Sequence, residues 1–326
     1  MSLEIIPVPG IGDVRPGDDL AGLVADAAPW LRDGDVVVVT SKVVSKAEGQ
    51  LVDVPTSGPE REAARDRILG AETARAVARR GHTRIVQTHH GFVMASAGID
   101  ASNVDRSQLV LLPKDPDLSA RSLRAALRSR LGVDVAVIVS DTMGRPWRAG
   151  LIDVALGVAG LEPIRDYRGE VDAYGNELHI TQMAVADELA SAAELVKNKH
   201  DQVPVVVIRG YSRLSTSDGP GGTALVRAAE QDLFSLGTAE ARVAGLREAA
   251  VLGDAELSDA PVDPAVIERV VAGTGFVHLG GGRIACRLDG DLVALGMGVQ
   301  RLRAAFAAEG LATRWQDGIL TVGYPQ

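Results

Sequence analysis

Cysteine is almost absent from this 326-residue sequence, which contains only Cys286. A single cysteine cannot close an intrachain disulfide, and it cannot supply the several thiolates of a cysteine-based zinc site. A lone cysteine within an apolar segment is most simply read as a small core residue. The fold must therefore form without an intrachain disulfide and without a cysteine-based zinc site.

Aromatic residues and long apolar runs are also scarce, and acidic residues outnumber basic ones. Aromatics make up 3% of the chain, so the core must come from Val, Leu, Ile and Ala. No apolar run approaches the ~20 residues of a membrane span, and the opening MSLEIIPVPGIG lacks the features of a secretion signal. We therefore expect a cytoplasmic protein with no membrane partner. The net charge of -9 argues against nucleic acid as a partner, because no basic field attracts phosphates.

The apolar patterning predicts a mixed α/β fold, with strands and amphipathic helices in alternation. Glycines between positions 88 and 107 indicate some antiparallel pairing as well. A helix should begin at Asp18 or Asp19. The other expected helices cover 58–80, 118–131 and 183–196, and the expected strands cover 4–7, 35–40, 83–88, 109–112, 133–139 and 203–210.

The pattern of apolar and polar residues changes near residue 245, where a linker-like stretch begins, LREAAVLGDAELSDAPVDPAV. We predict one domain at 1–245 and a small α+β unit at 246–326. In that unit FVHLGGGRIACRL and DLVALG are expected to be strand-rich. The segment VQRLRAAFAAEG should be a helix and GILTVGY a last strand.

Three familiar nucleotide or metal signatures fail on inspection. LVALGMGVQRL resembles a strand–GxG–helix, but Arg301 stands where the third glycine belongs. His89 and His90 are adjacent, and neighbours on a strand face opposite sides, so both are not expected on one ion. The sequence also contains no GxxxxGK[ST] loop, which excludes a conventional P-loop.

Polar residues gather where apolar segments end, the usual place for ligand chemistry in α/β sheets. TSKVVSK follows DVVVVT and contributes Ser41, Lys42, Ser45 and Lys46. A solvated basic turn is the alternative interpretation of this segment. The polar loop between Arg209 and Gly222 reads as flexible from its composition, yet a loop of this length is more often functional.

Two further segments carry candidate ligands. GIDASNVD offers Asp100 and Asn103 in a loop that could equally be a plain turn. In SDTMGRPWR, Asp141 and Thr142 could bind a hard divalent cation. Two arginines in the same segment could clamp phosphate or carboxylate, and they are Arg145 and Arg148. A helix N-cap at Asp141 is the competing structural interpretation. Together these groups form the inventory of phosphoryl transfer, with the nucleotide and acceptor left open.

Several motifs now combine into a resemblance. GDVVVVTSKVVSKAEG, GIDASNVD, VSDTMGRPWR, DAYGNEL and QDLFSLG occur in the order seen in the gamma-glutamyl ligase family, the coenzyme F420:L-glutamate ligases. The resemblance runs from residue 4 to 240 and is nearest to the amino-terminal half of the two-part actinobacterial enzymes.

The resemblance implies a GTP-dependent ligase that joins L-glutamate to coenzyme F420-0 and then adds further gamma-linked glutamates. It implies Mg²⁺ or Mn²⁺ as cofactor, K⁺ as a helper, and an intertwined homodimer. The substrates implied are F420-0, L-glutamate and GTP. Formation of an acyl phosphate and GDP, followed by attack of the glutamate amine, is the mechanism that we infer from it.

Site residues follow from the resemblance position by position. The metal-binding positions are Asp100, Asp141 and Thr142. The positions that contact the nucleotide are Ile11, Gly12, Asp13, Val14, Ser41, Lys46 and Asn103. Lys46 would also neutralise charge on the transferred group, and Arg145 or Arg148 would orient a phosphate or carboxylate. The loop from Arg209 to Gly222 falls at another nucleotide and metal loop, although no single ligand is carried over from it.

The carboxyl-terminal part departs from the two-part enzymes, in which a full flavin-binding domain follows the ligase. Only fragments such as DAPVDPAVIERVVA and LTVGYP resemble that domain, and its arginine-rich FMN-binding opening is missing. This argues against FMN as a cofactor. The rival hypotheses are a flavin-dependent reductase and a non-catalytic protein that binds a deazaflavin or a nucleotide.

Overall fold

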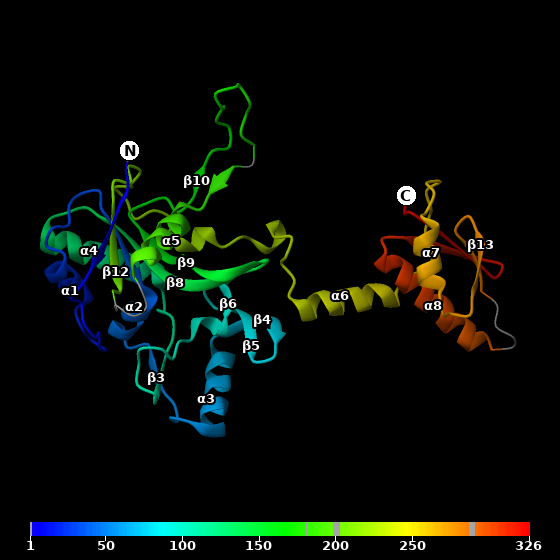
Figure 1. The fold of residues 1–326 in the computed structure, drawn as a ribbon, viewed down its shortest axis with the longest axis horizontal. Coiled ribbons are helices and arrows are strands. Elements are labelled where there is room, and N and C mark those ends of the chain that lie inside the picture. The colour runs from blue at the N-terminus through cyan, green and yellow to red at the C-terminus, as the bar shows by residue number, and fades with distance from the viewer. Residues whose placement is uncertain (1, 180, 198–202, 287–290) are drawn as a thin grey trace. The chain divides into compact units, whose positions relative to one another are not determined.

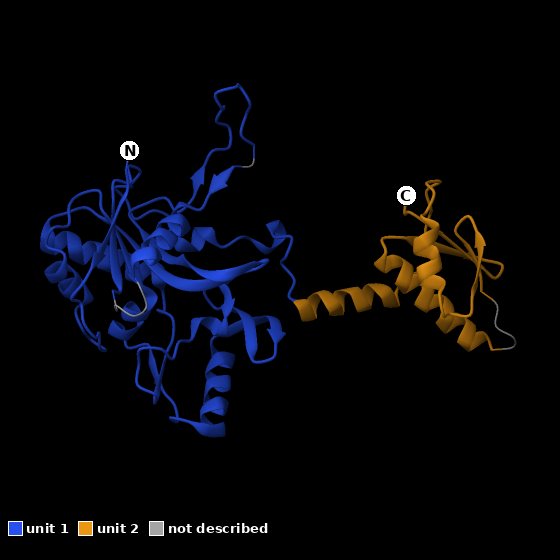
Figure 2. Cartoon of the chain, in the orientation of Figure 1, with its two compact units in different colours: residues 1–237 blue, residues 238–326 orange. Residues whose placement is uncertain are grey.

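The fold was analysed in a computed structural model, which describes residues 2–179, 181–197, 203–286 and 291–326 (Figure 1). The chain divides into two compact units, residues 1–237 and 238–326 (Figure 2). Position 245, where a boundary was expected, lies inside helix α6 (Thr238–Ala250). The division therefore comes at the start of that helix rather than within a linker.

A five-stranded sheet forms the centre of the first unit, in the order β1-β12-β2-β8-β9. These strands are β1 (Glu4–Val8), β12 (Val205–Arg209), β2 (Val36–Thr40), β8 (Ala136–Arg145) and β9 (Arg148–Ala159). β2 and β8 are parallel, and the other neighbours are antiparallel. The mixed α/β class predicted from the sequence is confirmed.

Both faces of this sheet are covered, which explains its unbroken valine-rich strands. Val37 and Val137 face the core shared with helices α1 (Leu20–Ala27) and α4 (Pro116–Leu131). Val38 and Ile138 face the opposite core, formed with α5 (Val185–Lys197). Because successive side chains of a strand point to opposite faces of the sheet, these apolar runs contribute side chains to both cores.

Smaller elements surround the central sheet. Helix α2 (Ser41–Ala47) follows β2 directly, and α3 (Gly58–Ala71) comes later. The short strands are β3 (Leu51–Asp53) with β7 (Gln108–Val110), β4 (Thr73–Arg80) with β5 (Thr83–Thr88) and β6 (Val93–Ala95), and β10 (Arg165–Asp166) with β11 (Gln182–Met183). The 3₁₀ turns are Ser96–Gly98, Gly222–Leu225 and Ala229–Gln231. No helix among the described residues is long and apolar enough to cross a membrane.

The strand expected at 133–139 is longer than its apolar pattern indicated. β8 continues through Asp141 and Thr142 to Arg145, because β9 pairs with this polar half, with Thr142 opposite Asp153. The N-cap interpretation of Asp141 is therefore wrong. Pro146 and Trp147 form the hairpin turn, where Trp147 has φ +65° and its side chain is 88% exposed.

The helix expected at 58–80 is also wrong in its second half. Helix α3 ends at Ala71, and Thr73–Arg80 pairs as strand β4 with β5. Over residues 73–77 half-buried and exposed positions alternate, which suits a strand with one face in solvent. Pairing with β5 thus overrides the helix-forming composition of this stretch.

The described residues of the second unit form an antiparallel sheet in the order β13-β14-β16-β15 and three helices. Its elements after α6 are α7 (Pro264–Val271), β13 (Val277–Gly280), β14 (Arg283–Ala285), α8 (Leu292–Ala308), β15 (Ala312–Gln316) and β16 (Ile319–Gly323). Its core includes Phe306, Ile267 and Leu320, and Cys286 is buried there as expected.

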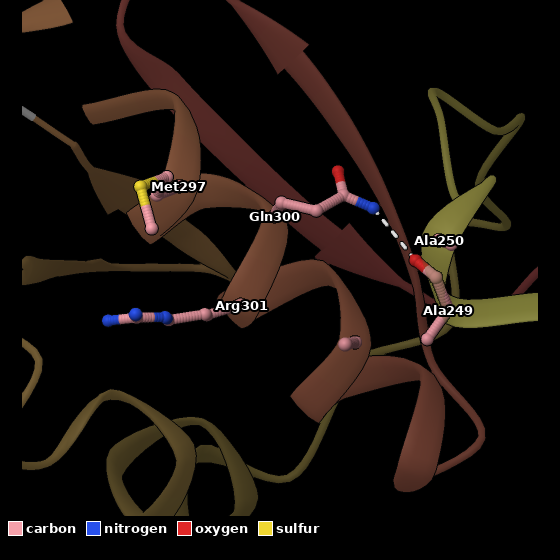
Figure 3. Close-up of a pocket in the computed structure, with 6 residues that line it drawn as sticks. Ala249, Ala250, Met297, Gln300 and Arg301 are labelled. Carbon is pink, nitrogen blue, oxygen red and sulfur yellow. Dashed lines mark hydrogen bonds between the residues drawn. The ribbon is translucent and has the colours of Figure 1, made fainter. Parts of the chain in front are cut away.

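One expectation in this unit is wrong, and the last residues of FVHLGGGRIACRL lie outside the described residues. DLVALG is not a strand, since Asp291 caps α8 and the helix begins at Leu292. The first five residues of the expected linker belong to helix α6, and its last three belong to α7. A recess of about 340 Å³ lies between α6 and α8, beside Gln300, whose side-chain amide donates to the Ala249 carbonyl at 2.8 Å (Figure 3).

The buried carboxylate of Asp117, at the start of α4, ties two distant segments together. It accepts hydrogen bonds from the backbone N–H groups of Val158, Gly222 and Thr223 and from the Thr223 hydroxyl. The Arg124–Asp218 ion pair, at 2.7 Å, holds the preceding residues of the loop. The polar loop before Gly222 is consequently anchored at both contacts, although its composition suggested flexibility.

We predict that Asp117→Ala lowers the free energy of unfolding by about 3 kcal/mol, because it leaves buried N–H donors without an acceptor. Urea unfolding would measure this change. Asp66→Ala, which removes an exposed partner of Arg84, is the control and should lie near the wild type. A loss no larger than that of the control would contradict the anchoring role of Asp117.

Candidate active site

A cavity of about 1190 Å³ opens in the first unit beside the end of β2 and the polar half of β8. It lies where a parallel pair of strands ends, as expected for ligand sites in such sheets. Eight of the residues predicted from the sequence line it, and they are Gly12, Asp13, Val14, Lys46, Asp100, Asn103, Asp141 and Thr142.

Helix α2 supplies two lysines to the cavity. Because it begins at Ser41, immediately after β2, Lys42 and Lys46 stand four residues apart on one helical face. Lys46 is buried, and its Nζ lies 2.8 Å from Oδ1 of Asp13. The hydrogen bond and the charge of Lys46 lower the pKa of the Asp13 carboxyl. These ammonium groups give one wall of the cavity a positive charge.

Asp100 is held by the second lysine and by a neighbouring serine. Lys42 Nζ lies 2.6 Å from Oδ2 of Asp100, and the backbone N–H of Ser102 donates to Oδ1 at 2.7 Å. Burial raises the pKa of Asp100, but these hydrogen bonds outweigh it and leave the pKa below its usual value. Asp100 is therefore a fixed carboxylate at the cavity wall.

Asp141 is the most perturbed acid in this cavity. Burial raises its pKa to about 7, and the backbone N–H of Thr142 opposes that rise. The negative charges of Asp153 and Asp100 raise the pKa further, whereas a hydrogen bond with Ser41 lowers it. The structure thus brings Asp100 and Asp141 close enough to repel one another, from positions 41 residues apart in the chain.

A buried ion pair that the sequence did not reveal forms another part of the wall. Lys197 Nζ, at the end of α5, lies 2.8 Å from Oδ2 of Asp153 on β9, and both residues line the cavity. Ser140 and Thr142 donate to the same carboxylate at 2.9 and 3.0 Å. The only sequence signal for Asp153 was its spacing, twelve positions after Asp141 and across the hairpin.

Four predicted site residues do not line the cavity. Ile11 is a core residue, and Ser41 is buried behind Asp141. Arg145 and Arg148 flank the hairpin turn, beyond the lining residue Gly144, and Arg148 is exposed. Within the described residues, no part of the loop from Arg209 to Gly222 borders this cavity either.

The two histidines are structural. His89 and His90 lie in the turn after β5 rather than on the strand, where their Nε2 atoms contact the carbonyl oxygens of Ala71 and Lys114 at 2.9 and 3.0 Å. Each ring thus has its own backbone partner, and no shared ion is needed to explain the pair.

The cavity suits a hard divalent cation with incomplete protein ligation. Asp100, Asp141 and Thr142 offer oxygen donors, and a cation would relieve the repulsion that raises the pKa of Asp141. Within the described ranges, no three Asp, Glu, His or Cys side chains are arranged to hold a metal alone. This donor set fits Mg²⁺ or Mn²⁺, which commonly take water and substrate phosphates as further ligands.

A mixed α/β domain with lysines facing a cluster of carboxylates is typical of an enzyme that handles anionic substrates. Residues 10–210 match the family F420-0:Gamma-glutamyl ligase, and the chain belongs to that family.

Three relatives illustrate the match, each called coenzyme F420:L-glutamate ligase. The protein of Methanothermobacter thermautotrophicus is 43% identical over 252 residues, which cover 72% of this chain and 99% of the relative. That of Methanopyrus kandleri is 42% identical, covering 72% and 98%. That of Haloarcula marismortui is 40% identical, covering 71% and 95%.

Proposed function

We propose that the chain is a GTP-dependent ligase that joins L-glutamate to coenzyme F420-0 and extends the product with gamma-linked glutamates. Family membership supports the substrates, since the relatives carry the name coenzyme F420:L-glutamate ligase. The single structural observation that carries the proposal is the cavity, where two lysines face two acids of different pKa.

The lysine wall would receive the nucleotide. Lys46 and Lys42 present their ammonium groups to the cavity, and Gly12 (φ +73°) lets the preceding loop turn so that Asp13 meets Lys46. Triphosphate oxygens would compete with Asp13, which is mostly exposed, for the Lys46 protons. Asn103, also at the wall, would contact the nucleotide.

The acidic wall would hold the divalent cation, Mg²⁺ or Mn²⁺, through Asp100, Asp141 and Thr142. When bound, the cation supplies charge neutralisation for the phosphoryl group during transfer. Lys42 already neutralises Asp100 in part, which leaves Asp141 as the carboxylate with the most to gain from a cation. K⁺ remains a proposed helper ion.

We expect the affinity for Mn²⁺ to rise as the pH increases toward 7 and then to level off. The Asp141 carboxyl, with its pKa at about 7, must lose its proton before it can bind a cation. The sign follows from competition, because protons and Mn²⁺ occupy the same oxygens. Calorimetric titrations with Mn²⁺ between pH 5.5 and 8 would show this, as ~ten-fold weaker binding per pH unit well below the pKa. A pH-independent affinity would contradict it.

The proposed reaction proceeds in two steps. A carboxylate oxygen of F420-0 attacks the γ-phosphorus of GTP, and the bond to the bridging oxygen breaks to release GDP and an acyl phosphate. The glutamate amine then attacks the acyl carbon, phosphate leaves, and the amine proton passes to solvent. Lys46 would stabilise the negative charge that develops on the transferred group. Arg145 and Arg148 would steer anionic substrate groups from the hairpin tip.

An intertwined homodimer, which the family resemblance implies, is also proposed. Trp147 and Phe234 lie against one another with ring centroids 6.1 Å apart, although they are 88% and 69% exposed. Exposed aromatic pairs are typical of surfaces that a protein partner covers. Sedimentation equilibrium would test this proposal, and a monomer at micromolar concentration would contradict it.

The decisive assay incubates the protein with F420-0, GTP, L-glutamate and Mn²⁺. The proposal predicts a mass gain of one glutamate per addition, with one GDP and one phosphate released for each. GTP binding without turnover would instead favour a non-catalytic nucleotide-binding protein. A yellow purified protein that carries FMN and reduces a deazaflavin would favour the reductase hypothesis.

A further inference from the structure

The Asp153–Lys197 pair has no role in the mechanism above, yet its surroundings are unusual. The side chains of Lys197 and Asp153 are only 7% and 3% exposed. A buried ion pair is often no more stabilising than apolar residues of the same volume, because both charges lose their hydration. Its place in the wall of the cavity points to a role other than stability.

Lys197 fixes Asp153 from one side. Its ammonium donates to Oδ2 of Asp153 at 2.8 Å and to the hydroxyl of Ser140 at 2.6 Å. Ser140 in turn donates its own proton to the same Oδ2 at 2.9 Å. The closed triangle compensates the charge of Asp153 and holds the carboxylate in one orientation.

The other oxygen of Asp153 faces Thr142. Oδ1 accepts the Thr142 hydroxyl proton at 3.0 Å, and the two residues are direct cross-strand partners in the β8–β9 hairpin. A hydroxyl has one proton and two lone pairs. Since its proton is committed to Asp153, the Thr142 oxygen is left as an acceptor at the cavity wall.

We propose that Lys197 is a positioning residue that acts through Asp153 to hold the Thr142 hydroxyl oxygen toward the divalent cation. The inference rests on the proposed function only in taking a divalent cation as an occupant of the cavity. Without Lys197, the carboxylate of Asp153 would lose the charge that compensates it and one of the bonds that orient it. Thr142 would then lose its fixed acceptor, and its oxygen would no longer be held toward the cation.

The test is a double-mutant cycle on Mn²⁺ affinity, measured by electron paramagnetic resonance without nucleotide. Lys197→Met should weaken binding about 10-fold, as expected for an outer partner of a metal ligand. Thr142→Val should weaken it by a similar factor, whereas Thr142→Ser, which keeps the hydroxyl, should not. In the double variant, Lys197→Met should add nothing to Thr142→Val, because both changes act through one oxygen.

Additive losses, about 100-fold in the double variant, would overturn the proposal, as would unchanged or tighter binding by Lys197→Met alone. If Lys197→Met does not fold, Ser140→Ala replaces it in the cycle, with the same non-additivity expected. The matched control is Arg303→Met in the second unit, which removes a buried cation from Asp254 and should leave Mn²⁺ affinity unchanged.

Failure of this inference can be told apart from failure of the proposed function. Ligation of glutamate by the wild type, together with normal Mn²⁺ binding by Lys197→Met, would overturn the positioning role alone. A non-additive cycle in a protein that does not ligate glutamate would uphold the positioning role and overturn the proposed function.

Discussion

Asp141→Asn is expected to lower kcat/KM for ligation by about 10²-fold or more, a larger loss than for any other side chain of the cavity. The amide keeps the size of the side chain but removes the negative charge that would face the cation. Burial and two neighbouring carboxylates raise the pKa of Asp141. The ionised form of this acid is therefore poorly stabilised in the structure, and a bound cation would stabilise it. Coupled release of GDP and mass spectrometry of the product would measure the loss.

The control for this substitution is Asp66→Asn, an exposed acid on α3 that pairs with Arg84 away from the cavity. It should leave the rate unchanged. Thermal unfolding of both variants separates loss of activity from loss of structure. A near-normal rate for a folded Asp141→Asn would remove this residue from the proposed metal site.

Lys46→Met should have the second largest effect, a rise of about 10- to 100-fold in KM for GTP, with a fall in kcat as well. Loss of a charge-assisted hydrogen bond to a phosphate accounts for this range. Lys46 is buried at the cavity wall, and exposed Asp13 is the partner it would exchange for the triphosphate. Initial rates at varied GTP, with F420-0 and glutamate saturating, would give both constants.

Lys114→Met provides the comparison, since Lys114 is an exposed lysine that does not line the cavity. Its kinetic constants should match those of the wild type. Unchanged KM for GTP together with unchanged kcat in Lys46→Met would show that the nucleotide lies elsewhere. A fall in kcat with unchanged KM would show that Lys46 stabilises the transition state without contributing to the binding of GTP.

The sequence predicted four of the five strands of the central sheet, because these strands carry their own signal, but it did not predict β9. Val36–Thr40 and Val205–Arg209 are apolar at nearly every position, and only a strand buried on both faces needs that pattern. The polar half of β8 could not be predicted in this way. Asp141 and Thr142 are in a strand only because β9 pairs with them, and that pairing depends on the tertiary structure.

The candidate site also contains residues that carry a signal in the sequence and residues that only the tertiary structure brings into it. Lys42 and Lys46 were visible because they follow a strand, and Asp100 and Asp141 because their motifs resemble those of a known family. The pair of Asp153 and Lys197 lies 44 positions apart in the chain and in no shared motif. A buried lysine on an amphipathic helix reads as a solvated residue until its partner across the sheet is known.

The central claim is that Asp100 and Asp141 share one cation beside a guanine nucleotide. It is tested most directly by anomalous diffraction from crystals of the protein grown with Mn²⁺ and GDP. The account predicts one manganese peak within coordination distance of both carboxylates, ~2.0–2.3 Å, with the diphosphate against Lys46. Manganese bound away from both acids, or a nucleotide outside this cavity, would contradict it.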